Sequence, residues 1–304
     1  MFPGSITDVK GIMVGHDTDK EAMTGCTAIL AKEGAVGGVD VRGGSPGTRE
    51  TDAFSDRGRV PLIHSVLLTG GSAFGLAAAQ GVMDYLEEEG IGFDTGVAKV
   101  PLVGAAVIFD LACGRADVRP TAQNGYFAAQ NATENNRDMG IIGAGTGAMV
   151  GKMLGPGYLQ KGGLGTASIK VGKATVGAMV AVNAVGNIHN HHTGEIIAGV
   201  YDKQKKRHLG LEEVTAFYAE KGQNTTICCI ATDAVLDKQQ THRLAMLAHD
   251  GFAMAIRPVH TQADGDTAFA MVTGKVVENV DMVLAVAAEV TARAIVNGVL
   301  AAQR

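Results

Sequence analysis

The side chain with the clearest chemical potential is the hydroxyl of Thr225, which opens the β-prone run 225–231 and follows Asn224. A threonine hydroxyl is a weak nucleophile and needs a base within reach. If the peptide bond before Thr225 were broken, the freed α-amine could be that base, because its ordinary pKa of roughly 7.7–8.0 leaves part of it neutral near pH 7. Strain at Asn224, permitted by the nearby Gly222, would assist such a break.

Two carboxylates, Asp264 and Asp266, flank Gly265. In an extended segment, residues two apart project from the same face, and glycine allows another group to approach closely. The pair could orient the amine or hydroxyl of Thr225, or bind the amino group of a substrate. The alternative is an Asp-Gly turn in which Asp266 caps the following element, and the residues alone favour this turn.

Three further residue types could contribute to such a site. Asn183 is a single polar side chain in an apolar run, and a buried amide must find hydrogen-bond partners, so on its own a structural hydrogen bond explains it best. Lys152 and Lys161 lie in a glycine-rich segment, where either could place a positive charge near the nucleophile; Lys152 is preferred. Tyr126, on its own, is typical of the edge of a core.

Metal and cofactor signals are weak. His189, His191 and His192, with Glu195 close by, have the composition of a metal cluster, but their spacing matches no helical ligand pair and the segment is turn-like. The four cysteines include no C-x-x-C pair, and two of them lie in an apolar run that favours burial. We therefore expect no metal and no other cofactor.

The elements that must position these residues come as strands in adjacent pairs and helices in separate runs. That order favours a layered α+β architecture over a regular βαβ series. Strands are expected at 11–14, 27–30, 36–41, 65–68, 100–111, 169–171, 175–182 and 225–231. Helices are expected at 73–89, 125–131, 212–221, 237–254 and 281–302, several with apolar residues at spacings of three and four. The polar stretch 187–210 is expected to be an exposed linker.

Composition narrows the class of protein. The chain has 304 residues, a net charge of -5 and a hydrophobic fraction of 46%, which is enough for a sizeable core. Only 26 residues are Lys or Arg and they form no stripe, so no nucleic-acid partner is expected. The N-terminus lacks an apolar stretch, and no apolar run reaches the ~20 residues that cross a membrane. We expect a soluble, cytoplasmic protein.

Nine stretches, in order along nearly the whole chain, resemble the L-aminopeptidase/D-esterase family, the DmpA-like peptidases of family S58, which includes nylon-oligomer hydrolases. They are VRGGSPGTR at 41–49, GGSAFGL at 70–76, PLVGAAVIFD at 101–110, GAGTG at 143–147, KGGLGTAS at 161–168, VAVNAVG at 180–186, NTTI at 224–227, ATDA at 231–234 and DGDT at 264–267. The Asn-Thr junction and the Asp-Gly-Asp triplet are similar to the nylon-oligomer branch.

The resemblance implies a four-layer αββα sandwich like that of the N-terminal nucleophile hydrolases. It implies one self-processing domain, 1–304, that cuts itself between Asn224 and Thr225 into an α chain, 1–224, and a β chain, 225–304. Thr225 would be the nucleophile for amide or ester bonds of small amino-acyl substrates, and Asn183 and Tyr126 would hold the oxyanion. Several αβ units would assemble into a homo-oligomer, without a cofactor.

Two alternatives share the fold. An acyltransferase of the ornithine-acetyltransferase type would also cut itself and use a threonine, but would pass the acyl group to an amine; its usual junction motifs are missing. An unprocessed chain could instead bind a small molecule without catalysis.

Overall fold

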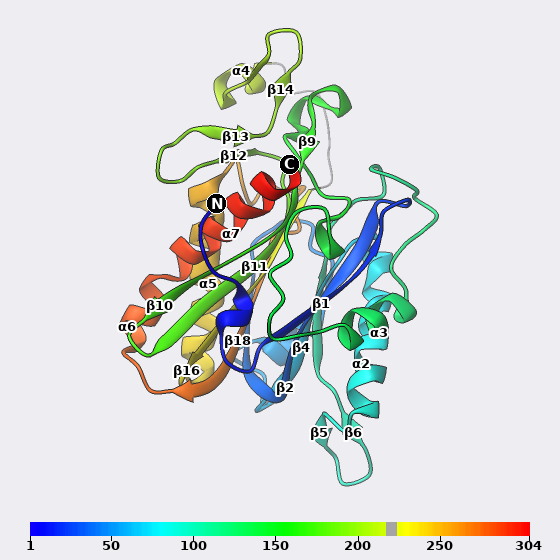
Figure 1. The fold of residues 1–304 in the computed structure, drawn as a ribbon, viewed down its shortest axis with the longest axis vertical. Coiled ribbons are helices and arrows are strands. Elements are labelled where there is room, and N and C mark those ends of the chain that lie inside the picture. Colours follow the sequence, from blue (N-terminus) through cyan, green and yellow to red (C-terminus); the bar gives the residue numbers. More distant parts are fainter. Residues whose placement is uncertain (217–223) are drawn as a thin grey trace.

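Nine strands form the central sheet of this computed structural model, which describes residues 1–216 and 224–304 (Figure 1). Their order is β10-β11-β16-β18-β2-β4-β7-β3, with β1 paired to β2. Their bounds are β1 Met13–Asp19, β2 Thr24–Val41, β3 Thr48–Arg49, β4 Ile63–Thr69, β7 Val103–Val107, β10 Gly163–Val171, β11 Ala174–Asn183, β16 Thr225–Ala234 and β18 Thr267–Val276. The long β2 pairs with β1 and β4 through its first half and with β18 through its second, so it joins two halves of the sheet.

The two halves of the sheet face each other across an apolar core. That core takes side chains from both halves, including Val66 and Leu68 of β4 and Ile227 and Cys229 of β16. A second core lies between the β10-β11-β16-β18 half and the helices α5 and α7, and a third lies between the β2-β4-β7 half and the helices α2 and α3. Figure 1 shows these helix pairs on opposite sides of the strands. The architecture is therefore α+β with four layers, as expected.

The helices and the shorter elements complete the fold. The α-helices are α1 Thr51–Phe54, α2 Ala78–Glu88, α3 Ala122–Gln130, α4 Leu211–Thr215, α5 Lys238–Ala255, α6 Val280–Ala285 and α7 Ala287–Ala302. The 3₁₀ turns are Ile6–Asp8, Ser72–Ala77, Gly143–Gly145, Lys152–Leu154 and Pro156–Tyr158. The short strands are β5 Phe93–Asp94, β6 Lys99–Val100, β8 Met149–Val150, β9 Gln160–Lys161, β12 Asn187–His189, β13 Ile196–Ala198, β14 Tyr201–Asp202, β15 Arg207–His208 and β17 Ile256–Arg257.

Several sequence expectations need correction. The strands expected at 27–30 and 36–41 are one strand, β2, whose pairing with β4 shifts register between Leu30 and Ala35. The expected linker 187–210 carries four short strands, because buried Asn187 bonds the backbone of Val200 and Leu209. The helix expected at 281–302 is broken at Val286 into α6 and α7. Residues 217–221 of the helix expected at 212–221, and Gly222, lie outside the described residues.

The C-terminal helical stretch Val280–Ala302 has the length and composition of a membrane span. Within the structure, however, 61% of its most apolar 18-residue segment is buried. Val283, Val290 and Val299 pack into the core against the sheet. The stretch is therefore explained as a core helix, whose apolar character faces protein.

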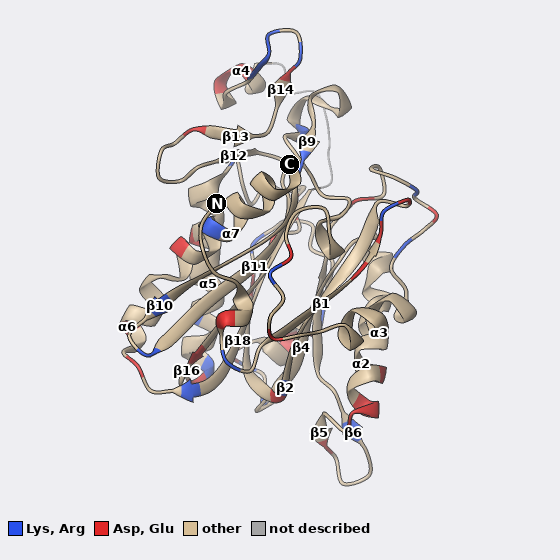
Figure 2. Ribbon diagram, in the orientation of Figure 1, with Lys and Arg blue, Asp and Glu red and all other residues tan. Residues whose placement is uncertain are grey.

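Charged residues are distributed in both signs over the surface. Figure 2 shows Lys and Arg interspersed with Asp and Glu, and the segment 203–207 beside β14 carries four basic residues. Arg207 in that run is already paired with Glu213, its Nη2 contacting Oε1 at 2.5 Å.

Strand pairing brings distant segments to one end of the sheet. β16 is antiparallel to β11, which sets Asn183 opposite Thr225, and parallel to β18, which sets Ile227 opposite Thr267. The loop before β18 therefore reaches the start of β16, where Asn224 bridges Asp264. β18 is antiparallel to β2, so the loop after Val41 arrives at the same end. This end carries the candidate site.

Candidate active site

The Asn224-Thr225 junction is buried and its carbonyl oxygen is held from two sides. Asn224 is 2% exposed and Thr225 is 6% exposed. The backbone N–H of Gly265 donates to the Asn224 carbonyl oxygen at 2.9 Å, and the Thr225 hydroxyl donates to the same oxygen. The Asn224 N–H in turn donates to the Ala263 carbonyl at 3.2 Å. The hydroxyl thus lies beside the one carbonyl that a self-cleaving chain would have to attack.

The two aspartates lie against this junction, but each carboxylate makes different contacts. Asp264 Oδ2 accepts the Thr261 N–H at 2.7 Å, a contact within its own loop. Asp266 Oδ1 accepts the N–H of Thr226, directly after the nucleophile candidate, at 2.7 Å. Burial and the neighbouring charge of Asp266 raise the pKa of Asp264 to about 6. The loop therefore places two carboxyl groups, one of them easily protonated, at the start of β16.

The loop after β2 holds this aspartate segment by its backbone. The N–H of Ser45 donates to the Asp264 carbonyl at 2.8 Å, and the N–H of Arg42 donates to the Asp266 carbonyl at 3.0 Å. A Cβ at Gly43 would lie 2.3 Å from the Asp264 carbonyl oxygen, so only glycine permits this approach. The glycine-rich stretch 41–49 thus fixes the position of Asp264–Asp266.

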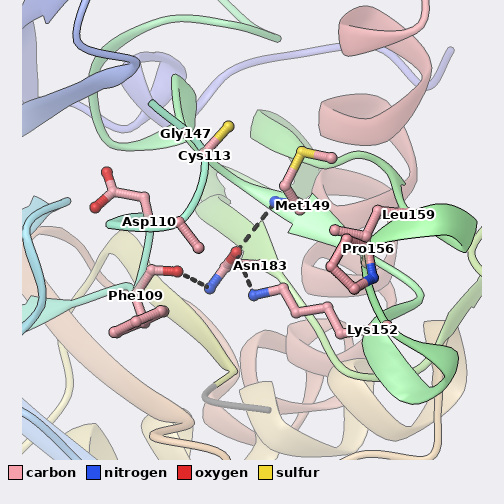
Figure 3. A pocket seen from close by; sticks show the side chains of 11 residues that line it. Phe109, Asp110, Cys113, Gly147, Met149, Lys152, Pro156, Leu159 and Asn183 are labelled. Atoms are coloured by element: carbon pink, nitrogen blue, oxygen red, sulfur yellow. Dashed lines mark hydrogen bonds between the residues drawn. The ribbon is translucent and has the colours of Figure 1, made fainter. Parts of the chain in front are cut away.

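Asn183 and Lys152 form a second group across the strand pair (Figure 3). Asn183 is fully buried, and its Oδ1 accepts the Lys152 ammonium at 2.7 Å and the Met149 N–H at 3.0 Å, while its Nδ2 donates to the Phe109 carbonyl at 3.2 Å. Loss of hydration lowers the pKa of Lys152 to about 7, although the charges of Asp264 and Asp110 act in the opposite direction. Lys152 is thus within electrostatic reach of Asp264.

Two cavities meet at Phe109. The larger cavity, of about 280 Å³, is lined by Lys152, Asn183 and apolar side chains that include Met149 and Leu159. The smaller cavity, of about 200 Å³, is lined by Thr225 and its neighbours. Phe109 lines both. Together they form a concave, largely apolar surface with a few polar groups, which is the usual character of a small-molecule site.

Asp110 lines the larger cavity with its carboxyl group already bonded. Its Oδ1 accepts the Gly71 N–H and its Oδ2 accepts the Thr24 hydroxyl, both at 2.7 Å. Burial raises the pKa of Asp110 despite these bonds. In Figure 3 its side chain lies to one side of the Asn183 group, so it supports the cavity wall.

Two sequence candidates lie elsewhere. The Tyr126 hydroxyl donates to Glu88 at 2.7 Å, and the Tyr126 ring packs edge-on against Tyr85 of α2. It lines neither cavity beside Asn183 and Thr225, which disagrees with an oxyanion role. The Lys161 ammonium contacts the Cys113 sulfur and the Thr146 carbonyl, both at 3.4 Å, so it is Lys152 that reaches Asn183.

The histidine cluster acquires a partner that the sequence did not indicate. His191 and His192 contact the two oxygens of Glu289 at 3.1 and 2.9 Å, and these three side chains could hold a metal ion. Glu289 also accepts the Arg293 guanidinium at 2.6 Å, and this positive charge opposes a cation there. His189 instead bonds the Gly194 carbonyl. The cluster is explained as a hydrogen-bonded network that ties the loop after β12 to Glu289 and Arg293 of α7.

Comparison with known proteins decides the family. The model of peptidase family S58 matches residues 4–304. The chain belongs to peptidase family S58. An uncharacterised aminopeptidase of Mycobacterium leprae is 44% identical over 293 residues, covering 90% of this chain and 79% of the relative. A 6-aminohexanoate-oligomer endohydrolase of Kocuria is 32% identical over 276 residues, covering 88% and 75%. As an S58 member, the chain is a peptidase or amidohydrolase.

Solved structures confirm the fold of this S58 chain. An L-aminopeptidase D-Ala-esterase/amidase of Ochrobactrum anthropi, described as a variant of the Ntn hydrolase fold, gives a TM-score of 0.73 at 22% identity, covering 98% of this chain and 86% of that one. A β-aminopeptidase of Burkholderia gives 0.70 at 24% identity, covering 97% and 85%. The expected resemblance to N-terminal nucleophile hydrolases is therefore confirmed at the level of the fold.

Sequence reasoning about this S58 chain missed three contributors to the site. The backbone N–H of Gly265 has no signal in the sequence, because every residue except proline carries the same group. Phe109 and Ser45 lie inside stretches that carried the family resemblance, yet neither side chain is chemically conspicuous. Only their position after β7 and β2, at the end of the sheet where Thr225 lies, gives them a role.

Proposed function

We propose that this chain is a self-processing amidohydrolase in which Thr225 becomes an N-terminal nucleophile. The observation that carries the proposal is the double contact on the Asn224 carbonyl oxygen, by the Thr225 hydroxyl and by the Gly265 N–H. A hydroxyl lies beside the carbonyl group that it must attack. A backbone donor already lies where negative charge would develop, which is the arrangement of an oxyanion hole.

Processing then proceeds as an N-to-O acyl shift. The Thr225 oxygen attacks the Asn224 carbonyl carbon, the C–N bond breaks, and the hydroxyl proton ends on the Thr225 nitrogen. Water hydrolyses the resulting ester, which leaves Asn224 as a carboxylate and restores the hydroxyl. Asp264 is a suitable proton carrier for this shift, since its pKa of about 6 lies near neutral pH. The products are the chains 1–224 and 225–304 of one folded domain.

In the processed enzyme the new α-amine of Thr225 serves as the base that activates its own hydroxyl. The acyl-enzyme forms when that hydroxyl attacks the substrate carbonyl. Asn183, opposite Thr225 in the strand pair, offers the oxyanion the amide hydrogen that is not donated to Phe109, and the Lys152 ammonium on its Oδ1 polarises that amide. Asp264 and Asp266 orient the amine. No cofactor takes part in any of these steps.

The substrates we propose are small amino-acyl amides, peptides or esters. The cavities of about 280 and 200 Å³ accommodate a compact acyl group, and the apolar lining of the larger one suits a hydrocarbon chain. One relative is named for 6-aminohexanoate oligomers, whose acyl units are such chains. The processed αβ unit is soluble, acts without nucleic acid or membrane, and assembles into a homo-oligomer.

Mass spectrometry of the purified protein tests the proposal. We expect two fragments, one of which begins at Thr225, and a single uncut chain in Thr225→Ala. Thr225→Ser keeps a hydroxyl and serves as the matched control that should still be cut. An uncut wild-type chain that hydrolyses amino-acyl amides would refute the mechanism.

A further inference from the structure

His260 contacts Asp266 of the candidate site through two hydrogen-bond donors. Its backbone N–H lies 3.1 Å from Asp266 Oδ2, and its ring Nδ1 lies 2.8 Å from the same oxygen. The other oxygen of Asp266 accepts the Thr226 N–H. Asp266 is 1% exposed, so these three protein donors take the place of water around the carboxylate. An ionised carboxylate only accepts hydrogen bonds, which assigns the ring proton of His260 to Nδ1.

The backbone of His260 adopts a conformation that L-residues seldom use. Its φ is +58°, in the left-handed region, where Asn, Asp and His are the non-glycine residues most often found. Such a conformation persists where surrounding contacts over-determine it, and it clusters at functional sites. Here it lets one residue direct both its N–H and its ring at a single carboxylate oxygen.

Behind the ring of the partly buried His260 lies a fully buried histidine, His249. The His249 ring centroid is 4.8 Å from that of His260, with the planes nearly perpendicular. His249 Nε2 donates to the Asp40 carbonyl at 3.0 Å, so His249 is held by β2 and cannot follow a displaced His260. The charged groups that interact with this pair are Asp266 and Asp264 on the loop, Asp40 near the end of β2 and Arg42 directly after that strand. The His260 ring is therefore enclosed between a fixed ring and the carboxylate.

The carboxylate tethers the part of β16 that processing would turn into a chain end. The regular pairing of β16 with β18 starts at Ile227, and Asp266 supplies the acceptor for the residue before it. Chain ends fray unless they are tied down. After cleavage, Asp266 would hold the first peptide unit behind the nucleophile, and Asp266 itself would be held by His260.

We propose that His260 is a positioning residue, which fixes Asp266 through Nδ1–H and thereby keeps Thr225 in a reactive position after cleavage. The inference deepens the proposed function and rests on it. His260 does not touch the reacting atoms; it acts only through Asp266.

Three variants separate the ring donor from the backbone conformation. His260→Asn places an amide nitrogen where Nδ1 stood and tolerates a left-handed backbone. His260→Gln moves that nitrogen one bond further, and His260→Gly relieves the backbone but removes the donor. Each is purified from full-length expression, its cleavage is followed on denaturing gels, and its kcat and KM are measured on a chromogenic amino-acid anilide, with melting temperatures alongside.

We expect His260→Asn to keep kcat within about threefold of wild type, while His260→Gln and His260→Gly lose about tenfold or more in kcat with little change in KM. Full activity of His260→Gly, or equal loss in His260→Asn and His260→Gly at similar melting temperatures, would overturn the inference. A wild-type chain that is not cut before Thr225 would instead remove the proposed function.

A spectroscopic reading on the wild-type protein covers variants that fail to fold. In protein labelled with ¹⁵N-histidine, one ring signal, missing from His260→Asn, should report a fixed Nδ1–H tautomer. A ring in rapid tautomer exchange, or in the Nε2–H form, would contradict the contact with Asp266 and overturn the inference.

Discussion

Replacing Gly265 by alanine perturbs the proposed cleavage geometry without removing any hydrogen-bonding group. The variant keeps the backbone N–H that donates to the Asn224 carbonyl, and it adds one methyl group. A Cβ built at Gly265 lies 2.8 Å from Thr225 Oγ1 and 2.9 Å from the Ser45 carbonyl oxygen. Ordinary contact begins at 3.4 Å, so these distances are short by 0.6 and 0.5 Å. The hydroxyl must move, since the Ser45 backbone is itself bonded to the loop.

The expected magnitude follows from that displacement. A misplacement of about 1 Å of a reacting group can cost on the order of 100-fold in rate, so a shift of about half that size predicts a loss of about tenfold in cleavage. Overpacking of a buried site costs about 1–3 kcal/mol in the free energy of unfolding. For a chain of this size each kcal/mol lowers the melting temperature by about 2–4 °C. Gly265→Ala should therefore fold, melt a few degrees lower and cut itself slowly.

The assay is a time course of self-cleavage on denaturing gels after synthesis of the chain in a cell-free system. Gly157→Ala is the matched control, because a Cβ there meets nothing within 4 Å. Thr225→Ser in the Gly265→Ala background removes the methyl group that lies 3.3 Å from the added Cβ and should recover part of the rate. Cleavage of Gly265→Ala at the wild-type rate would show that the hydroxyl does not react from this position.

Three further predictions concern the charged groups and Tyr126. The rate of self-cleavage should fall as the pH drops through about 6, where Asp264 of the uncut chain takes up a proton, and Asp264→Asn should lack this limb of the pH–rate profile. The lowered pKa of Lys152, about 7, means that unfolding takes up a proton above that pH, so the free energy of unfolding should rise with pH from neutral towards about 10. Urea denaturation at about pH 7 and about pH 9 can test this on the uncut variant Thr225→Ala, with and without Lys152→Met. The free energy of unfolding should rise between these pH values only in the chain that keeps Lys152. Tyr126→Phe should keep kcat/KM within about twofold because its hydroxyl bonds Glu88, and a tenfold loss would return Tyr126 to the site.

The regular elements could be predicted because their signals are local. The helix expected at 237–254 is observed at Lys238–Ala255, with Asp237 as its N-cap, and the strand expected at 65–68 is observed at Ile63–Thr69. Apolar spacing and capping residues act within a few positions, so they can be read from sequence. The break at Val286 has no such signal, since its neighbours on both sides continue the apolar pattern.

The candidate residues of the site could be selected from the sequence, but their arrangement in space could not. The family resemblance selected Thr225, Asn183 and the two aspartates, and the structure brings these four together. The resemblance could not place Tyr126 in space. A motif fixes a position along the chain, but it leaves open which side of α3 faces the site. His260 had no signal at all, since a single histidine in a loop acquires meaning only from a carboxylate that meets it in space.

The topology also explains how a cut could be tolerated at the junction. In the sheet order β11-β16-β18-β2, both strands that follow Thr225 lie between two strands that precede it. Cleavage before Thr225 severs the chain where β16 begins, and the ladders on both sides of the β16–β18 pair stay in place. The β chain would remain bound through two lines of backbone hydrogen bonds and the cores that flank them. The fold can therefore release a backbone amine at its centre without releasing the segment that carries it.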